Sequence, residues 1–427
     1  MQAATTTTRP SLTGQDWANA IAHATDSNAY IQIVASFPGH VDEDLLRQAV
    51  AYTIQVFPVL GCRFDDSGET PVWTRVHDAD MHKWVQAERT TANDSAIERF
   101  LADAGAPLEQ MIAVKLLLTG EESILCIRID HACCDGGGAK AYLKFLCDVY
   151  SSLAGYSAEP LTAYNSGDRS VKQVFSACNI SAAREAYRPE KNQPQPTVTL
   201  PFCKQRGNQM RFARRCIPHH EWRSAAGITI NDRIVAAYVR CLQKHAITDD
   251  NRLPDRLAVN VTIDLRRYLQ PNDAPAICNL SGMETVSIPI ADEGYLATVH
   301  KVHNEMEGVK RNQPGLHSAA SMEFLTGMPY RKARDFLLQA SEKQVRSGVS
   351  TPILSNLGQI DEVKLADMRA TDVNIIVPAF HAPAFMLGCN SYGNQLTLTI
   401  GYYCGERAET DIQAFLDDIA AELCQQE

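Results

Sequence analysis

The sequence has no long apolar run and no excess of positive charge. Its most apolar stretch, IIVPAFHAPAFMLG from Ile375, is short and is interrupted by two prolines and a histidine, so it cannot span a bilayer. Forty lysines and arginines against fifty aspartates and glutamates give a net charge of −10. This balance disfavours a nucleic-acid binder, because phosphate neutralisation needs clustered cations. We therefore expect no membrane span, no nucleic-acid partner, and a small molecule or small protein as the ligand.

The N-terminus also lacks the features of a signal peptide. Its first residues, MQAATTTTRPSLTGQDW, contain neither a basic start followed by an apolar core nor a cleavage site, and we expect the threonines to be frayed. Thirteen cysteines are an odd number in a long chain and lack the dense even spacing of a secreted disulfide scaffold. We therefore expect a soluble protein of the cytoplasm with reduced thiols.

The chain does have the length and composition of a folded protein with two cores. Its 427 residues exceed what one core usually holds, and 45% hydrophobic with 21% charged residues is ordinary for a globular protein. The richest linker signal is YRPEKNQPQPTVTLP, in which four prolines lie among polar residues. We expect a first lobe at 1–187, a linker at 188–200 and a second lobe at 201–427.

Strand and helix patterns occur in both halves, which indicates an α/β class. In the first half we expect a strand at 30–39, a helix capped by Asp42, a helix at 97–105 and two hairpins, at 62–76 and 111–130. In the second half we expect a hairpin-like segment at 205–218, helices at 228–245, 291–311, 331–345 and 410–423, and strands at 256–269, 351–358 and 394–403.

The most informative segment is IDHACCDGGG, residues 129–138. The strand before it is apolar at nearly every position except Arg128, which is typical of a strand buried on both faces. Such a strand would deliver His131 from the middle of the protein. A helical apolar stripe follows the glycines and ends near Gly155. The motif is therefore predicted to occupy a tight turn between strand and helix.

Two binding interpretations of this turn are weak. It holds a histidine, two cysteines and an aspartate, all of which are metal-ligand types, but adjacent cysteines on an extended turn point apart and no Cys-x-x-Cys pair occurs elsewhere. As a phosphate loop it lacks both the GxxxxGK spacing around Lys140 and the Ser or Thr that would hold magnesium. We expect no metal ion here.

Two catalytic interpretations remain, beside one that is structural. In the first, Cys134 is a nucleophile activated by His131. In the second, His131 is a general base for a hydroxyl or amine, Asp135 holds the loop, and Gly136 lets the backbone approach the substrate and offers its N–H to an oxyanion. In the third, a buried histidine bonds a backbone carbonyl. The stretch alone does not decide between them.

The spacing His131-Ala-Cys-Cys-Asp135-Gly136 resembles the HxxxDG signature of the chloramphenicol-acetyltransferase-like superfamily, which includes condensation domains and several groups of acyltransferases. Further segments resemble the family in the same order along the chain. They are DLLRQAVAYTIQVFPVLGCRF near the start, TINDRIVAAYVRCL, VTIDLRRYL with Asn279 after it, and SNLGQID at 355–361. One position departs from the condensation-domain pattern HHxxxDG, because Asp130 stands where the first histidine would be.

The resemblance implies a pseudo-dimer of two similar lobes with a tunnel between them. His131 would be the general base at the meeting point of a thioester and an acceptor, without a covalent enzyme intermediate. Asp135 would pair with Arg266 of the segment Asp264-Leu-Arg266 as a structural clamp, for which the planar guanidinium is well suited. Asn279 would support its loop. Ser355 and Asn356 would line the tunnel.

A basic segment, Lys204 to Arg215, stands out in this acidic chain. Lys204, Arg206 and Arg214 could attract the diphosphate of coenzyme A, or the phosphopantetheine and acidic helix of a carrier protein. A solvated hairpin face is the alternative interpretation.

The sequence therefore predicts an acyltransferase that moves an acyl group from acyl-CoA or acyl-phosphopantetheine to an alcohol or amine. No cofactor would be permanently bound, and an acyl or peptidyl carrier protein is a candidate partner. A free-standing condensation enzyme that joins carrier-bound substrates is one alternative, and a non-catalytic docking module of the same fold is another.

Overall fold

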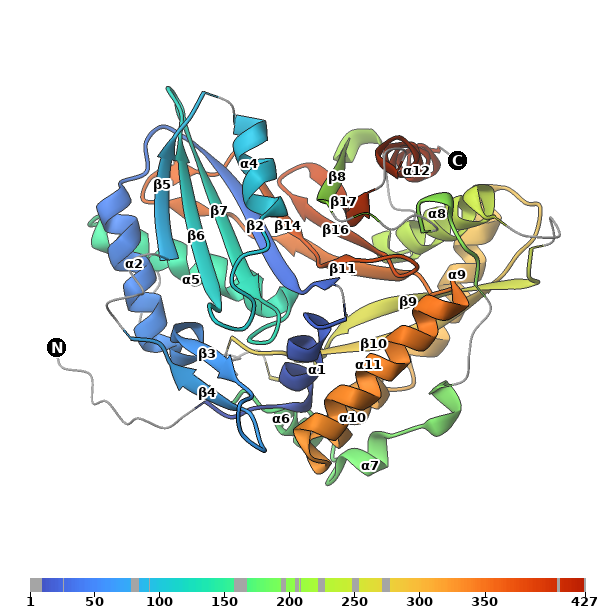
Figure 1. The fold of residues 1–427 in the computed structure, drawn as a ribbon. Coiled ribbons are helices and arrows are strands. Elements are labelled where there is room, and N and C mark those ends of the chain that lie inside the picture. The colour runs from blue at the N-terminus through green and yellow to red at the C-terminus, as the bar shows by residue number, and fades with distance from the viewer. Residues whose placement is uncertain are drawn as a thin grey trace.

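The computed structural model contains two large β-sheets side by side, each covered by helices, with helix α1 (Gly14–Ala22) between them (Figure 1). Two further two-stranded sheets are formed by β3 (Cys62–Asp65) with β4 (Val72–Arg75) and by β12 (Lys364–Leu365) with β13 (Met368–Arg369). The structure describes residues 10–425 except 26, 78–83, 92, 157–166, 193–196, 204–206, 208, 222–226, 248–252, 271–276 and 405–407. The expected α/β class is confirmed.

The first sheet has five strands in the order β14, β2, β7, β6, β5. Their bounds are β14 Asp372–Ile376, β2 Tyr30–Pro38, β7 Glu122–Asp130, β6 Ile112–Leu118 and β5 Val85–Arg89. The pair β5 and β6 is parallel and the other pairs are antiparallel. Both expected hairpins are present, the smaller one as β3 (Cys62–Asp65) and β4 (Val72–Arg75).

Strand β7 is buried on both faces, as its composition predicted. Ile127 and Ile129 lie in the main core of this lobe, together with helices α2 (Glu43–Val56) and α5 (Gly136–Leu153). Ile124 and Cys126 point the other way, into a smaller cluster with helix α4 (Asn93–Ala102). Strand β7 therefore ends in the interior of the molecule, and the residue after it starts from a buried position.

The second sheet has eight strands. Its path is β1 (Ser27–Asn28), β15 (Ala379–Phe380), β17 (Gln395–Cys404), β16 (Met386–Tyr392), β11 (Ile353–Ile360), β9 (Arg256–Asp264) and β10 (Ser281–Pro289), with β8 (Gln209–Pro218) paired to β17. One face carries a core that includes Val259, Leu354 and Phe415 and is covered by helices α8 (Ile230–His245), α9 (Tyr295–Lys310) and α12 (Ala408–Leu423).

The remaining elements are shorter or lie outside the two layers. They are α6 (Lys172–Ala177), α7 (Ala183–Ala186), α10 (Leu316–Glu323), α11 (Tyr330–Ser347), β12 (Lys364–Leu365) and β13 (Met368–Arg369), with the 3₁₀ turns η1 (Pro58–Gly61), η4 (Pro189–Asn192), η5 (Pro201–Cys203), η6 (His219–Glu221), η7 (Leu265–Tyr268) and η8 (Phe324–Gly327).

Segments of the two halves cross into each other's sheets. Strand β14, from the second half of the chain, pairs along its length with β2 of the first half, and β1 pairs with β15. Side chains from 360–375, among them Val373 and Ile375, belong to the first core. The boundaries at 187 and 201 remain a prediction, and the sheets do not follow them strictly.

Two expectations about the elements were wrong. In the described part of 205–218 there is no hairpin: residues 209–218 form one strand, β8, which pairs with β17 over ten residues. The strand expected to run to 269 ends at Asp264, because the Asp264 side chain accepts a hydrogen bond from the Arg266 N–H and starts η7.

Candidate active site

His131 follows β7 directly, in the turn before α5. Its backbone N–H donates to Ala29 O at 2.9 Å, and the turn closes with Cys133 N–H on Asp130 O at 3.0 Å. The half-buried imidazole lines a cavity of about 120 Å³ at the junction of the two lobes. A histidine in this place can reach a ligand that enters between the lobes.

Asp135 is the N-cap of α5 and is almost fully buried. Its carboxylate accepts the Gly138 N–H at 2.8 Å and the Leu280 N–H at 2.7 Å. It also forms the expected ion pair with Arg266, whose Nη1 lies 2.9 Å away. Burial of the carboxylate opposes ionisation, but the Arg266 charge and these hydrogen bonds outweigh it and hold the pKa of Asp135 below its ordinary value.

Arg266 connects the second lobe to this turn. Besides Asp135, its guanidinium contacts Asp264 at 3.2 Å and donates to Cys278 O at 3.0 Å. A Cβ on Gly137 would come within 2.5 Å of Arg266 Nη1, so this glycine makes room for the ion pair. A Cβ on Gly136 would instead meet Leu357, at 2.3 Å. Two of the three glycines therefore allow the second lobe to pack against the start of α5.

Ser355 and Asn356 line the same cavity as His131. Ser355 accepts a weak hydrogen bond from Thr262, and the Asn356 side chain donates to Asn231 Oδ1 at 3.1 Å. Lys140 of α5 donates to Leu357 O at 2.8 Å, which ties the helix to the bulge in β11.

A second hollow, of about 670 Å³, lies further along the sheet. Thr262, Ser281 and Ser355 line the His131 cavity, and the residues two positions away on the same three strands, Asn260, Met283 and Ile353, line the second hollow. Residues two apart on a strand share one face. Both hollows therefore lie along the face of the second sheet that is turned away from α8, α9 and α12, with α1 and α11 walling the larger one.

Asn279 was expected only to support its own loop, but its side chain also contacts His131. Its Oδ1 lies 3.2 Å from His131 Nδ1, and its Nδ2 donates to His131 O at 3.0 Å and Ala132 O at 3.1 Å. It therefore contacts both the ring and the backbone of the histidine.

The thiols of the motif are poorly placed for chemistry. Cys133 and Cys134 have no exposed surface, and neither lines the cavity that His131 lines. Burial raises the pKa of Cys133 well above its ordinary value. These facts disfavour a thiolate nucleophile. Among the described residues, no group of three His, Cys, Asp or Glu side chains is arranged to hold a metal ion.

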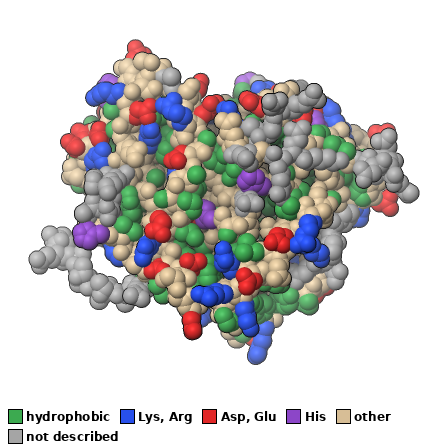
Figure 2. Space-filling view, in the orientation of Figure 1, with side chains coloured by type: hydrophobic (Ala, Val, Ile, Leu, Met, Phe, Trp, Pro, Cys, Tyr) green, Lys and Arg blue, Asp and Glu red, His purple; other side chains and the backbone are tan. Residues whose placement is uncertain are grey.

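The basic segment is largely neutralised where it is described. Arg214 lies on β8 and pairs with Asp372 at 2.7 Å, while Arg211 and Arg215 approach Glu98 and Asp417. None of the three lines either hollow. Lys204 and Arg206 lie outside the described residues, so donor binding by this segment stays a prediction. On the face seen in Figure 2, positive and negative side chains are intermixed.

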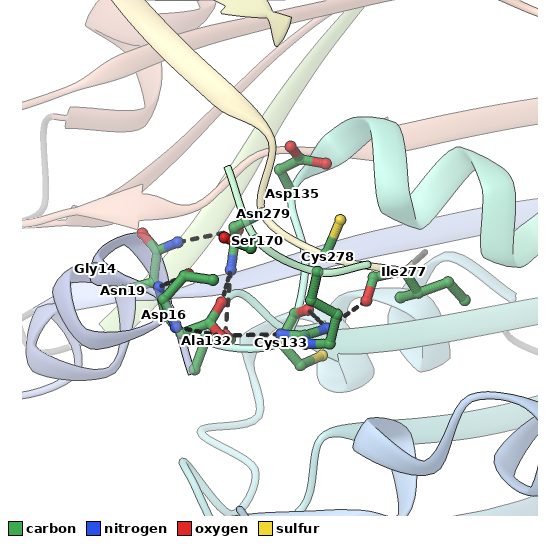
Figure 3. A network of polar contacts seen from close by, with 12 residues as sticks. Gly14, Asp16, Asn19, Ala132, Cys133, Asp135, Ser170, Ile277, Cys278 and Asn279 are labelled. Carbon is green, nitrogen blue, oxygen red and sulfur yellow. Dashed lines mark hydrogen bonds and ion pairs between the residues drawn. The ribbon is translucent and has the colours of Figure 1, made fainter. Parts of the chain in front are cut away.

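Sequence reasoning missed a group of polar residues behind the histidine, of which Asp16 and Arg169 are buried and Asn19 is half-buried. Asp16 and Asn19 on α1 contact Asn279 (Figure 3). Arg169 donates to Cys133 O in the turn after His131. A Thr-x-x-Asp capping box at Thr13 and Asp16 was the available signal for α1, and no short motif marks Arg169.

The structural role of the buried Asp130 was also not expected from the sequence. It is fully buried and accepts hydrogen bonds from His23 Nε2, Leu108 N–H and Ala132 N–H, so it fixes the turn that leads to His131.

Comparison with known proteins identifies the fold. Residues 278–425 match the family described as the WS/DGAT C-terminal domain. The first condensation domain of the calcium-dependent antibiotic synthetase is similar with a TM-score of 0.72 and 14% identity, over 98% of this chain and 96% of that chain. Trichothecene 15-O-acetyltransferase from Fusarium sporotrichioides gives 0.69 and 14%, over 97% and 95%. No curated protein sequence gives a significant match.

A third similar structure carries ligands. It is the starter condensation domain of rhizomide synthetase, solved as a double mutant with C8-CoA and Leu-SNAC, with a TM-score of 0.68 and 16% identity over 100% of this chain and 96% of that chain. In the described part of this chain, no helix has the length and apolar character needed to cross a bilayer.

The similarity to these three solved structures identifies the architecture. The chain has the two-lobed α/β fold shared by condensation domains and acyltransferases.

Proposed function

We propose that the protein is an acyltransferase that moves an acyl group from a thioester to an alcohol or amine, with His131 as the general base. The observation that carries this proposal is the position of His131: a half-buried imidazole in a cavity between the lobes, contacted at Nδ1 by Asn279. An imidazole is the base best matched to neutral pH, and its Nε2 is the atom left for the acceptor.

The reaction balances without a covalent enzyme intermediate. His131 Nε2 takes the proton of the acceptor as its oxygen or nitrogen attacks the thioester carbonyl carbon. The carbonyl oxygen becomes an oxyanion, which we place near the N-terminus of α5, where the Gly136 N–H and the helix dipole favour negative charge. Collapse of the intermediate breaks the carbon–sulfur bond, and the imidazolium returns the proton to the departing thiolate.

Asp135 and Arg266 hold this geometry and do not take part in the chemistry. Their ion pair fixes the turn that carries His131 against the second lobe. Asp264 accepts from the same guanidinium. Ser355 and Asn356 form part of the wall against which substrate would lie.

Two hollows on one sheet face support a reaction of two substrates. The smaller one contains His131 and the larger one lies two residues further along β9, β10 and β11. We propose that donor and acceptor approach His131 from different ends of this face. The rhizomide condensation domain was solved with an acyl-CoA and an aminoacyl thioester analogue, which supports acyl-CoA or acyl-phosphopantetheine as the co-substrate here. No permanently bound cofactor is needed, and we place the reaction in the cytoplasm.

The second candidate function is a free-standing condensation enzyme that joins carrier-bound substrates, which the similarity to condensation domains favours. The donor distinguishes the two. An acylated carrier protein that reacts where acyl-CoA is inert would favour condensation. A non-catalytic docking module is a weaker candidate, because His131, Asp135 and Arg266 are present together in the geometry described.

The test is thiol release from acyl-CoA, or from an acylated carrier protein, in the presence of a panel of alcohols and amines, with products identified by mass spectrometry. We expect His131→Ala to lose at least about a hundredfold in rate, the lower end of what general-base catalysis contributes. Cys134→Ala is the matched control in the same turn and should stay active. Undiminished turnover in His131→Ala would refute the base assignment, and loss in folded Cys134→Ala would revive the thiol mechanism.

A further inference from the structure

The side-chain amide of Asn279 can be oriented from its neighbours. Its Nδ2 faces three oxygens, Asp16 Oδ1 at 2.9 Å, His131 O at 3.0 Å and Ala132 O at 3.1 Å. Two of these are backbone carbonyls and the third is a carboxylate oxygen, so all three accept hydrogen bonds. The reversed amide would place its oxygen against three acceptors. The nitrogen therefore belongs on this side.

This orientation directs Asn279 Oδ1 toward the catalytic ring. The oxygen receives a hydrogen bond from Asn19 Nδ2 at 3.1 Å and lies 3.2 Å from His131 Nδ1. An amide oxygen only accepts, so His131 Nδ1 must carry the hydrogen at this contact. In the neutral imidazole the other nitrogen, Nε2, then keeps its lone pair.

Asp16 is itself held firmly in place. It is fully buried in the first turn of α1, where it forms a capping box with Thr13. Its Oδ2 accepts from Arg169 Nη2 at 3.0 Å. Burial raises the pKa of Asp16, and the Arg169 charge and the hydrogen bonds to its two oxygens act in the opposite direction.

Arg169 connects the same network to the turn that carries His131 and to the segment that carries Asn279. Its Nη1 donates to Cys133 O, in the turn that carries His131, and to Ile277 O, two residues before Asn279. Its side chain is buried. Figure 3 shows Asp16 and Asn19 on one helix, facing Asn279 and the turn at Ala132 and Cys133.

We propose that Asp16, Asn19 and Arg169 are positioning residues which, through Asn279, hold His131 in the tautomer with Nδ1 protonated and Nε2 free to accept a proton. The inference rests on the proposed function, in which Nε2 is the base. It adds that the tautomer is set by a helix at the start of the chain and by an amide from the second lobe.

The wild-type protein gives the first test. In protein labelled with ¹⁵N-histidine, the neutral His131 ring should give its pyridine-type signal from Nε2 and its pyrrole-type signal from Nδ1. Signals lost in His131→Gln identify the residue. The opposite tautomer in the wild-type protein would overturn the inference, whatever the activity. Because this readout needs no substrate, it is independent of whether the proposed reaction occurs.

The second test is Asp16→Asn, which keeps the shape but replaces an acceptor with a side chain that can donate, so that the Asn279 amide can turn. We expect a mixed His131 tautomer, and a kcat lowered at least about tenfold with little change in KM. In the serine-protease triad, loss of the carboxylate that orders the histidine costs about 10⁴ in kcat. A folded Asp16→Asn with the wild-type tautomer would refute the role of Asp16.

Asp232→Asn is the matched control. Asp232 is also fully buried and forms the same capping box, with Thr229 of α8, but contacts His303 instead of the catalytic turn. It should lose stability without changing the His131 tautomer. Should Asp16→Asn not fold, Asn279→Ala tests the same point, because it removes the oxygen that faces Nδ1. An unchanged tautomer there would overturn the inference, and a mixed one would support it.

Discussion

At the residue scale, the carboxylate of Asp135 holds the turn that carries His131 against the second lobe. It caps α5, accepts the Leu280 N–H and pairs with Arg266, so it joins three segments of the chain. Removing one partner of a buried ion pair leaves the other uncompensated, which typically costs about 3–5 kcal/mol. We expect a loss of this order in the free energy of unfolding of Asp135→Asn at neutral pH.

The pH dependence of this loss has a defined sign. Because the folded-state pKa of Asp135 lies below its ordinary value of 3.8, its contribution is fully present above about pH 4 and is lost as the pH falls through the folded-state pKa. Urea unfolding of wild type and Asp135→Asn should therefore converge below about pH 4. Asp264→Asn is the control, since this exposed carboxylate on the same arginine should contribute about 0–1 kcal/mol. A gap that stays constant into acid would contradict the assignment.

At the same scale, the expected ion pair of Asp135 with Arg266 is present beside His131, whereas the contact of Asn279 with the His131 ring was not expected from the sequence. A motif shows which residue types are present and at what spacing. It does not show which way an amide faces, because that depends on Asp16 and on two carbonyls that approach it only in the folded chain. For the basic segment, the sequence shows the positive charges but not the acidic side chains that pair with them in the fold. It therefore overstated the free positive charge of Arg214 and its neighbours.

At the element scale, α1 both packs into the first core and contributes Asp16 and Asn19 to the contacts with Asn279. It was not expected from the sequence, because the threonines before it suggested a frayed end. Yet Thr13 accepts the Asp16 N–H at 3.1 Å, and Trp17 and Ile21 are buried in the first core. Most of the other elements followed their periodicity. Strands whose partners lie far along the chain, such as β8 with β17, could not be paired from local patterns.

Substitution of Thr13, the N-cap residue of α1, tests whether this helix is coupled to the site around His131. Replacing an N-cap threonine with alanine typically costs about 0.5–2 kcal/mol. We expect Thr13→Ala to lower the melting temperature slightly and also to lower kcat, because Asp16 lies in the same turn. Thr229→Ala, in the equivalent capping box of α8, should lose comparable stability and keep kcat. Equal kcat values in the two variants would show that α1 is not coupled to the site.

On the scale of the whole molecule, the two lobes are interlocked. Strand β14 completes the first sheet from the second half of the chain, and Lys140 bonds backbone of the second half from α5. A linear division at a proline-rich segment does not show such exchanges, because the pairing of β14 with β2 joins residues that are more than 300 positions apart in the chain. We therefore expect the protein to unfold as one cooperative unit.

A substitution in the crossing strand tests this expectation. Ile375 of β14 is fully buried, and truncation of such a side chain typically costs about 2–5 kcal/mol. Tryptophan fluorescence reports mainly the first core, where Trp17, Trp73 and Trp84 lie, whereas far-UV circular dichroism reports both lobes. In Ile375→Ala both melting curves should shift together by the same amount. A shift in fluorescence alone would mean that the lobes unfold separately.

The buried Asp130 bears on how this motif can diverge. Its carboxylate receives two backbone N–H groups, from Leu108 and Ala132, and the His23 ring also contacts it. An imidazole in its place has at most one lone pair to offer and a larger volume to accommodate. A histidine at position 130 alone would therefore leave the Leu108 or Ala132 N–H without its acceptor, and we expect a double-histidine version of this turn to need further changes near His23 and Leu108.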